Sequence, residues 1–123
     1  MIVGQVTPDH EAVIRLRLRG VHRPELLVDA AIDTGFTDFL TLPPAMIGTL
    51  GWPFRESGRA TLADGNEVEV HIFRGVVLWD GRERGLLVVA ADSEPLVGMS
   101  LLYGSRVTLD VVDGGPVVIE SLP

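Results

Sequence analysis

Residues 26–35 read Leu26-Leu27-Val28-Asp29-Ala30-Ala31-Ile32-Asp33-Thr34-Gly35. The segment 26–32 is mainly aliphatic, which is typical of a strand, and it delivers an aspartate at its end. Gly35 lets the backbone come close to the Asp33 carboxylate, with its N–H directed at the oxygens. An ordinary turn after a strand contains the same residue types, so Asp33-Thr34-Gly35 alone does not identify a catalytic loop.

A second apolar segment lies far downstream. It reads Leu96-Val97-Gly98-Met99-Ser100-Leu101-Leu102, in which two apolar residues and a glycine precede a predicted short helix from about Met99 to Tyr103. We interpret Ser100 as a cap of that helix. The ordered pair of motifs is more specific than either motif by itself.

Composition excludes several classes of function. The 123 residues predict one domain, 1–123, and the net charge of −7 argues against nucleic-acid binding. There is no cysteine, no apolar run long enough to span a bilayer and no signal-peptide pattern, so we expect a cytoplasmic protein without membrane contact. A mean hydropathy of +0.32 indicates either an apolar self-association surface or a strand-rich core.

Short strand-like segments separated by turn residues predict a mainly β protein, a closed antiparallel barrel or a sandwich, with one or two short helices. The predicted turns are centred on Pro8-Asp9, Asp64-Gly65, Asp80-Gly81 and Asp113-Gly114-Gly115, and the first helix is predicted at Pro44–Leu50. The predicted strands are Met1–Thr7, Ala12–Arg19, Leu26–Ile32, Arg59–Ala63, Val68–Phe73, Gly75–Trp79, Leu86–Ala91, Arg106–Val112 and Pro116–Ile119. Arg15, Arg17 and Arg19 alternate with aliphatic residues, which predicts a solvated outer strand face.

Peptide hydrolysis by aspartate requires two carboxylates that share one proton. One carboxylate activates the attacking water and the other polarises the scissile carbonyl, and the pair titrates in two separated steps. Asp-Thr-Gly occurs once in this chain, at Asp33–Gly35. A catalytic pair therefore requires a homodimer in which Asp33 of each subunit meets across a two-fold axis, and Thr34 offers its hydroxyl to the partner loop.

From Leu26 to Leu102 the chain resembles the retropepsin-like (clan AA) aspartic proteases, in particular their small single-domain prokaryotic members. The resemblance implies a closed β barrel of the retropepsin-like acid protease type and aspartic endopeptidase activity without a cofactor or metal. It implies catalytic roles for Asp33, Thr34 and Gly35, and bracing of the active site by Leu96, Val97 and Gly98. It also implies that a hairpin flap closes over a peptide or protein substrate bound in extended form. The substrate-binding residues are then Thr37, Asp38, Ala63, Asp64, Gly65 and Asn66.

The sequence departs from the viral members of that family at two positions. Where those members carry an arginine and an aspartate that form an ion pair, this chain has Met99 and Thr37, which suggests a different local brace. Asp38 is interpreted either as a hydrogen-bond partner of the substrate backbone or as a cap of its own turn. The segment Pro116–Ile119 either joins a sheet shared with a second chain or completes its own barrel.

The alternative function is a non-catalytic dimeric β module that binds extended peptide segments without cutting them. His10, His22 and His71 are isolated in sequence, so no metal site is expected. Trp52 and Trp79 lie in apolar contexts and are interpreted as core or interface residues.

Overall fold

A computed structural model describes residues 1–22 and 25–123, and within them the chain is mainly β with two short helices, as predicted. The strands are β1 (Ile2–Val6), β2 (Ala12–Leu18), β3 (Leu26–Ile32), β4 (Leu40–Leu42), β5 (Phe54–Thr61), β6 (Glu67–Trp79), β7 (Arg82–Ala90), β8 (Leu96–Val97), β9 (Ser105–Leu109) and β10 (Pro116–Ser121). The helices are α1 (Pro44–Leu50) and α2 (Met99–Leu102). No helix among these residues is long and apolar enough to cross a bilayer.

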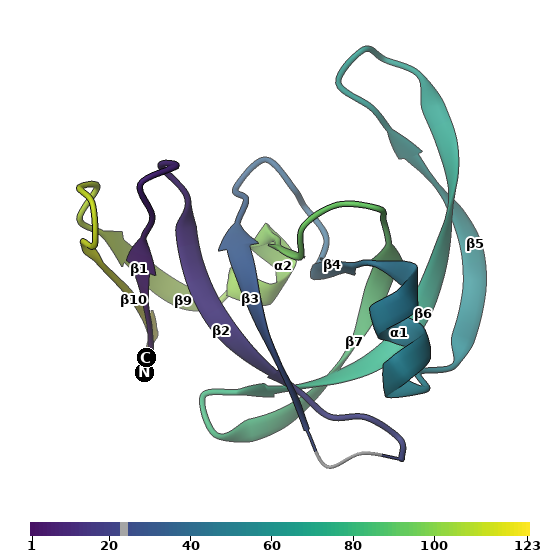
Figure 1. Cartoon of the computed structure of the whole chain (residues 1–123), viewed down its shortest axis with the longest axis horizontal. Helices are drawn as coiled ribbons and strands as arrows, with labels where there is room; N and C mark the ends of the chain where they lie inside the picture. The colour runs from purple at the N-terminus through teal and green to yellow at the C-terminus, as the bar shows by residue number, and fades with distance from the viewer. Residues whose placement is uncertain (23–24) are drawn as a thin grey trace.

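Six strands close into a barrel in the order β6-β7-β4-β8-β3-β2, and the ring is completed where β2 pairs with β6. Figure 1 shows this ring with α1 on one side and the long β5–β6 hairpin rising beyond it. The closing seam is short, because only Arg17 with Leu78 and Leu18 with Val77 are in register across it. The prediction of a closed barrel is confirmed.

The barrel is antiparallel except at two pairings. β3 runs parallel to β8, and β4 runs parallel to β7, whereas the other four pairings in the ring are antiparallel. Parallel neighbours end at the same edge of a sheet. The β3–β8 pair therefore brings Asp33, which follows β3, next to Gly98, which follows β8.

Three further strands extend the sheet from β2 in the order β1-β10-β9. β10 pairs on one side with β1, where Ile2 faces Ile119, and on the other side with β9, where Val107 faces Ile119. Residues 116–119 were expected either to join a sheet shared with a second chain or to complete their own barrel. They lie in β10, between β1 and β9 of the same chain and outside the six-stranded ring. Figure 1 places the two chain ends side by side at this edge.

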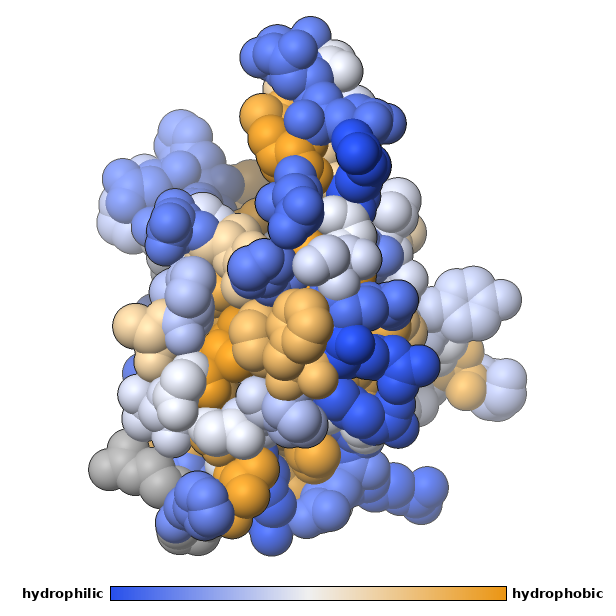
Figure 2. All heavy atoms as spheres, turned by 90° about the vertical axis from the view of Figure 1, so that its right-hand side faces the viewer, coloured by the Kyte–Doolittle hydropathy of each residue, from blue (hydrophilic) through white to orange (hydrophobic). Residues whose placement is uncertain are grey.

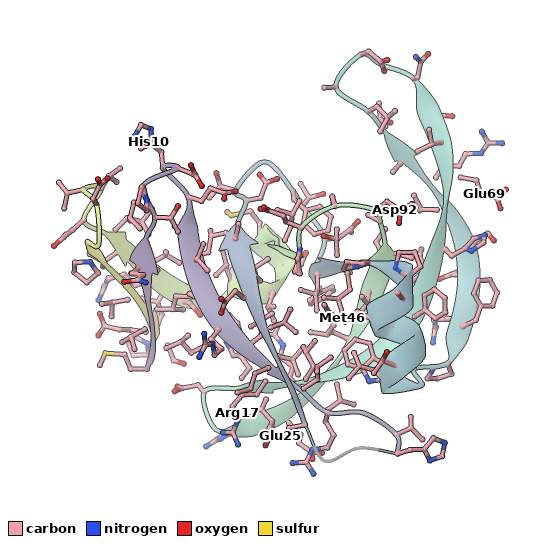
Figure 3. All side chains as sticks on the ribbon, in the orientation of Figure 1. His10, Arg17, Glu25, Met46, Glu69 and Asp92 are labelled. Atoms are coloured by element: carbon pink, nitrogen blue, oxygen red, sulfur yellow. The ribbon has the colours of Figure 1, made fainter. Side chains whose placement is uncertain are left out.

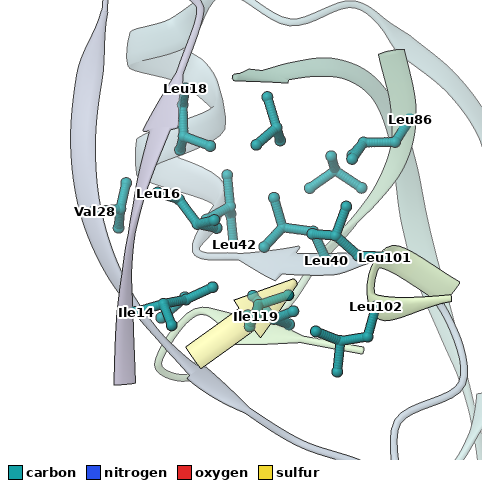
Figure 4. Close-up of a cluster of buried hydrophobic side chains, with 14 of the residues drawn as sticks. Ile14, Leu16, Leu18, Val28, Leu40, Leu42, Leu86, Leu101, Leu102 and Ile119 are labelled. Atoms are coloured by element: carbon teal, nitrogen blue, oxygen red, sulfur yellow. The ribbon is translucent and has the colours of Figure 1, made fainter. Parts of the chain in front are cut away.

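The core fills the barrel with aliphatic side chains from β2, β3, β4, β7, β10 and both helices. Figure 4 shows part of this cluster, in which Leu101 and Leu102 of α2 join Leu40 and Ile119. Because α2 has four residues, it is too short to be stable alone, and these two buried leucines fix its position on the barrel. Trp52 is buried at 5% exposure, which confirms its interpretation as a core residue.

The outer face of β2 carries Arg15 and Arg17, and Arg19 follows the strand directly and is exposed as well, as the alternation predicted. Their side chains are exposed and pair with Asp29, Glu25 and Glu83, respectively. Arg17 and Glu25 are seen together at the lower end of the molecule in Figure 3. Exposed pairs of this kind contribute little to stability.

Candidate active site

Asp33 lies directly after β3, at the start of the loop 33–39 that connects β3 to β4. The Asp33 backbone N–H donates to the carbonyl oxygen of Val97 at 2.9 Å, which continues the β3–β8 ladder by one further bond. The Asp33 side chain is half-buried. The apolar run 26–32 thus anchors the strand in the barrel and leaves the carboxylate at its end.

The Asp33 carboxylate is held by its own loop. Gly35 N–H donates to Asp33 Oδ1 at 2.9 Å, and Phe36 N–H donates to the Asp33 carbonyl oxygen at 3.1 Å. A Cβ at Gly35 would come within 3.3 Å of the same Oδ1, so a glycine suits this position. Thr34 is exposed, and its hydroxyl makes no hydrogen bond within residues 1–22 and 25–123.

Gly98 is the closest contact between the second motif and the Asp33 loop. A Cβ built there would lie 2.1 Å from the Asp38 carbonyl oxygen, 2.6 Å from a ring carbon of Phe36 and 2.8 Å from the Phe36 carbonyl oxygen. Only a residue without a side chain allows this approach. Gly98 N–H also donates to the Phe39 carbonyl oxygen at 3.0 Å, so the segments 96–98 and 33–39 are bonded along their length.

Strand β8 is fixed in turn by its neighbours. Leu96 N–H donates to the hydroxyl of Thr41 at 3.0 Å, and Ala31 N–H donates to the Pro95 carbonyl oxygen at 3.0 Å. Thr41 is the single buried polar side chain among the described residues. Buried polar groups require a hydrogen-bond partner, and the bond from Leu96 N–H supplies one for the Thr41 hydroxyl. Leu96, Val97 and Gly98 therefore occupy the positions at which a brace of the Asp33 loop was predicted.

Thr37 and Asp38 lie in the same loop as Asp33 and are exposed. Their backbone carbonyls accept from Ser100, through Oγ at Thr37 and through N–H at Asp38. The interpretation of Ser100 as a helix cap is wrong, since Gly98 is the N-cap of α2 and no side chain caps it. Ser100 is the second residue of α2, not the residue before it, and its hydroxyl donates to the Thr37 carbonyl oxygen of the loop.

The hairpin tip, residues 62–66, contains the other four predicted substrate contacts. Asp64 accepts from the backbone N–H and the side-chain amide of Asn66, both at 2.9 Å, and Gly65 has φ +86°. The tip is closed by Gly65 N–H on the Leu62 carbonyl oxygen at 2.9 Å. Figure 1 shows this tip and the loop after β3 at the same end of the molecule, and within the described residues no hydrogen bond joins them.

The β5–β6 hairpin has two unlike faces. Gly58 faces Val70 and Ala60 faces Val68 across the strands, while Arg59 faces Glu69 on the other side of the ribbon. In Figure 3 Glu69 points away from the barrel, so the apolar side of the hairpin is turned toward the barrel end. Figure 2 shows the hairpin rising from the top of the molecule, with hydrophobic atoms at the surface between polar ones. The apolar side remains accessible, with Val68 36% and Leu62 47% exposed.

The charged side chains of the loop 33–39 itself are two carboxylates, Asp33 and Asp38. Within the described residues no arginine or histidine forms an ion pair with Asp33, and no second carboxylate hydrogen-bonds to it. The described residues also hold no cluster of three or more histidine, aspartate or glutamate side chains that could bind a metal ion. Within the described residues of one chain, Asp33 is therefore not bonded to a second carboxylate, whereas water activation by aspartate requires two.

Sequence reasoning missed two residues that hold the loop from behind. Arg84 of β7 donates to the carbonyl oxygens of Leu101 at 3.1 Å and Ser100 at 3.4 Å, and its guanidinium lies over the Phe39 ring. Thr41 is the second, as described above. Neither has a local signal, since Arg84 lies in a charged alternation and Thr41 in a three-residue strand.

Comparison with known structures identifies a similar fold. A crystal structure of a retropepsin-like aspartic protease from Rickettsia conorii matches with a TM-score of 0.61 and 16% identity, over 99% of this chain and 91% of that chain. No protein-family model and no curated protein matches the sequence. The structural match, together with the closed barrel, shows that the chain has the retropepsin-like fold.

Proposed function

We propose that the protein is an aspartic endopeptidase whose active site is assembled from two copies of the chain. Asp33 of each subunit lies at the two-fold axis, and the two carboxylates share one proton. The ionised carboxylate takes a proton from the attacking water, and the protonated one polarises the scissile carbonyl and then protonates the leaving amine. Thr34 ties the two loops together, and the protein acts without a cofactor or metal.

The observation that carries this proposal is the construction of the Asp33 loop. A half-buried carboxylate is held by Gly35 N–H at 2.9 Å and is anchored through Asp33 N–H to Val97, in a fold shared with a retropepsin-like aspartic protease. A simple turn after a strand does not require the tight approach of Gly98. Such close backbone packing of Gly98 against the Asp33 loop is expected where the carboxylate must be held in one precise position.

The hairpin supplies the substrate side of the proposal. Its apolar face, turned toward the barrel end, is suited to the side chains of an extended peptide, and Thr37 and Asp38 are suited to its backbone. Gly65 at φ +86° gives the tip the freedom that a flap requires. Ala63, Asp64 and Asn66 maintain the turn and reach the substrate from above.

The test follows cleavage of a mixed pool of unstructured peptides as the protein concentration rises. The wild type is expected to show specific activity that increases with concentration and then levels off, and Asp33→Asn is expected to be inactive. Asp29→Asn is the matched control, because it removes a carboxylate from the exposed face of the same strand. It should retain the activity of the wild type.

Subunit mixing tests the shared site directly. At a concentration where wild-type activity has levelled off, an equal amount of Asp33→Asn should reduce cleavage per wild-type chain to about half, because mass action distributes wild-type chains equally between active and mixed dimers. Cleavage by wild type that is insensitive to added Asp33→Asn contradicts the two-chain site. A stable dimer that binds extended peptides but never cuts them favours the peptide-binding module.

A further inference from the structure

The position of helix α2 determines the shape of the Asp33 loop. Met99 N–H donates to the Phe36 carbonyl oxygen at 2.8 Å, and Ser100 N–H donates to the Asp38 carbonyl oxygen at 3.2 Å. The Ser100 hydroxyl donates to the Thr37 carbonyl oxygen as well. Three consecutive loop residues, 36–38, are therefore bonded to the first two residues of α2, and any movement of α2 is transmitted to the loop.

Besides its two buried leucines, the carboxyl end of α2 is contacted by the side chain of Arg84, which hydrogen-bonds to its carbonyl groups. A four-residue helix leaves its last carbonyl groups without partners inside the helix. Arg84 satisfies two of them, through Nη1 to the Leu101 carbonyl oxygen at 3.1 Å and Nη2 to the Ser100 carbonyl oxygen at 3.4 Å. A cation with fixed, planar donors suits the carboxyl end of a helix.

The same guanidinium also contacts the loop from its far end. Arg84 Cζ lies 5.8 Å from the centroid of the Phe39 ring, and the Phe39 carbonyl oxygen accepts from Gly98 N–H at 3.0 Å. Arg84 is half-buried and comes from β7, which neighbours β4 in the barrel. It thus joins α2, which follows the second motif, to Phe39, which closes the Asp33 loop.

Among the described residues Arg84 is the one guanidinium that hydrogen-bonds to α2. Met99 and Thr37, the uncharged residues on either side of the α2–loop contact, form no ion pair there. We propose that Arg84 is a positioning residue that fixes the Asp33 loop by clamping α2 to Phe39. This inference rests on the proposed function, because it assigns Arg84 to the productive placement of the Asp33 carboxylate.

The test compares Arg84→Ala with Arg82→Ala. Arg82 lies two residues earlier on β7 and is exposed, and its side chain forms no hydrogen bond or ion pair among the described residues, so it is a matched control. We expect Arg84→Ala to lower kcat by about 10- to 100-fold with little change in KM, because a small displacement of a catalytic group has an effect of that order. Arg82→Ala should leave both constants unchanged.

Chemical rescue separates positioning from general stabilisation. Arg84 lines an open hollow of about 380 Å³ with Phe39, Met99, Ser100 and Tyr103, so a free guanidinium ion can enter once the side chain is shortened. Millimolar guanidinium chloride should restore part of the lost kcat of Arg84→Ala, and sodium chloride of equal ionic strength should not. Should Arg84→Ala fail to fold, Arg84→Lys replaces it, and it should lose kcat because an ammonium cannot reach both carbonyls in one plane.

Amide hydrogen exchange gives a readout that needs no activity. Loosening of α2 should accelerate exchange of the Met99 and Ser100 amides at least about tenfold in Arg84→Ala, since these N–H groups are bonded to the loop. An unchanged kcat, or unchanged exchange at both amides, overturns the proposal. If the wild type is inactive at every concentration, the proposed function fails on that result alone, and the exchange rates still decide whether Arg84 positions the loop.

Discussion

Replacing Gly98 by alanine is expected to damage the fold and the site together. The new Cβ would lie 2.1 Å from the Asp38 carbonyl oxygen, whereas ordinary contact begins at 3.4 Å, so the loop backbone has to move by about 1.3 Å. Two of the three atoms in the way are backbone carbonyl oxygens, which cannot rotate aside as a side chain can. Overpacking costs about 1–3 kcal/mol, and weakening of the bond from Gly98 N–H to the Phe39 carbonyl oxygen adds about 1 kcal/mol, so the total is about 2–4 kcal/mol, with about 3 kcal/mol as the central value.

Urea unfolding measures this effect. For an m-value of about 1.5 kcal/mol per molar, a loss of about 3 kcal/mol lowers the unfolding midpoint by about 2 M. Gly48→Ala is the control, because Gly48 lies in α1 and a Cβ there meets no atom within 4 Å. It should raise stability by about 0.5–1 kcal/mol through the better helix propensity of alanine. A Gly98→Ala midpoint equal to that of the wild type would refute the claim that the loop is packed directly on Gly98.

Three further results are expected. Gly75→Ala should lower the free energy of unfolding by about 1–3 kcal/mol in urea titrations, because its Cβ would lie 2.6 Å from the Trp52 ring; an unchanged midpoint would contradict this packing. Gly65→Ala should lower the free energy of unfolding by about 1 kcal/mol in urea titrations, because φ is +86° at Gly65, and it should accelerate amide exchange at the hairpin tip. An equal loss of stability in Gly48→Ala would contradict the assignment of this effect to the backbone conformation of Gly65. Cleavage should be fastest from acidic to near-neutral pH and decline as the shared proton leaves; a rate that still rises above about pH 8 in a pH–rate profile would rule out the carboxylate pair.

Elements with a clear local pattern were predicted from the sequence. β3 at Leu26–Ile32 and α1 at Pro44–Leu50 match the predicted bounds. Each is mainly apolar, and each is followed by residues that end it, Asp33-Thr34-Gly35 after β3 and Gly51 after α1. α2 ends at Leu102, one residue before the predicted Tyr103. β4 and β8 have three and two residues, which is too short for any periodicity to indicate a strand. They are neighbours in the sheet, and they form because the longer strands β7 and β3 lie on either side of the pair.

Two errors have tertiary causes. Residues 68–79 were predicted as two strands interrupted near Gly75, but β6 is continuous from Glu67 to Trp79. The glycine is present because the Trp52 ring packs on it, not because the chain turns. β5 begins at Phe54, earlier than the predicted Arg59, since its residues gain strand structure by pairing with β6. The Asp33-Thr34-Gly35 motif and its place after β3 could be predicted from the sequence, but the contacts of Arg84 with α2 and Phe39 join segments that are distant in the chain.

The short seam between β2 and β6 has a consequence for how the chain folds. The ring closes through two register pairs, Arg17 with Leu78 and Leu18 with Val77, and one further bond from Arg19 N–H to the Val76 carbonyl oxygen at 2.9 Å. These segments are far apart in the chain, so closing the ring requires ordering everything between them. Until it closes, the end of β2 around Arg17 and Leu18 and the matching part of β6 present unpaired edges to other molecules. Recovery of the native protein from denaturant should therefore fall as the chain concentration during refolding increases.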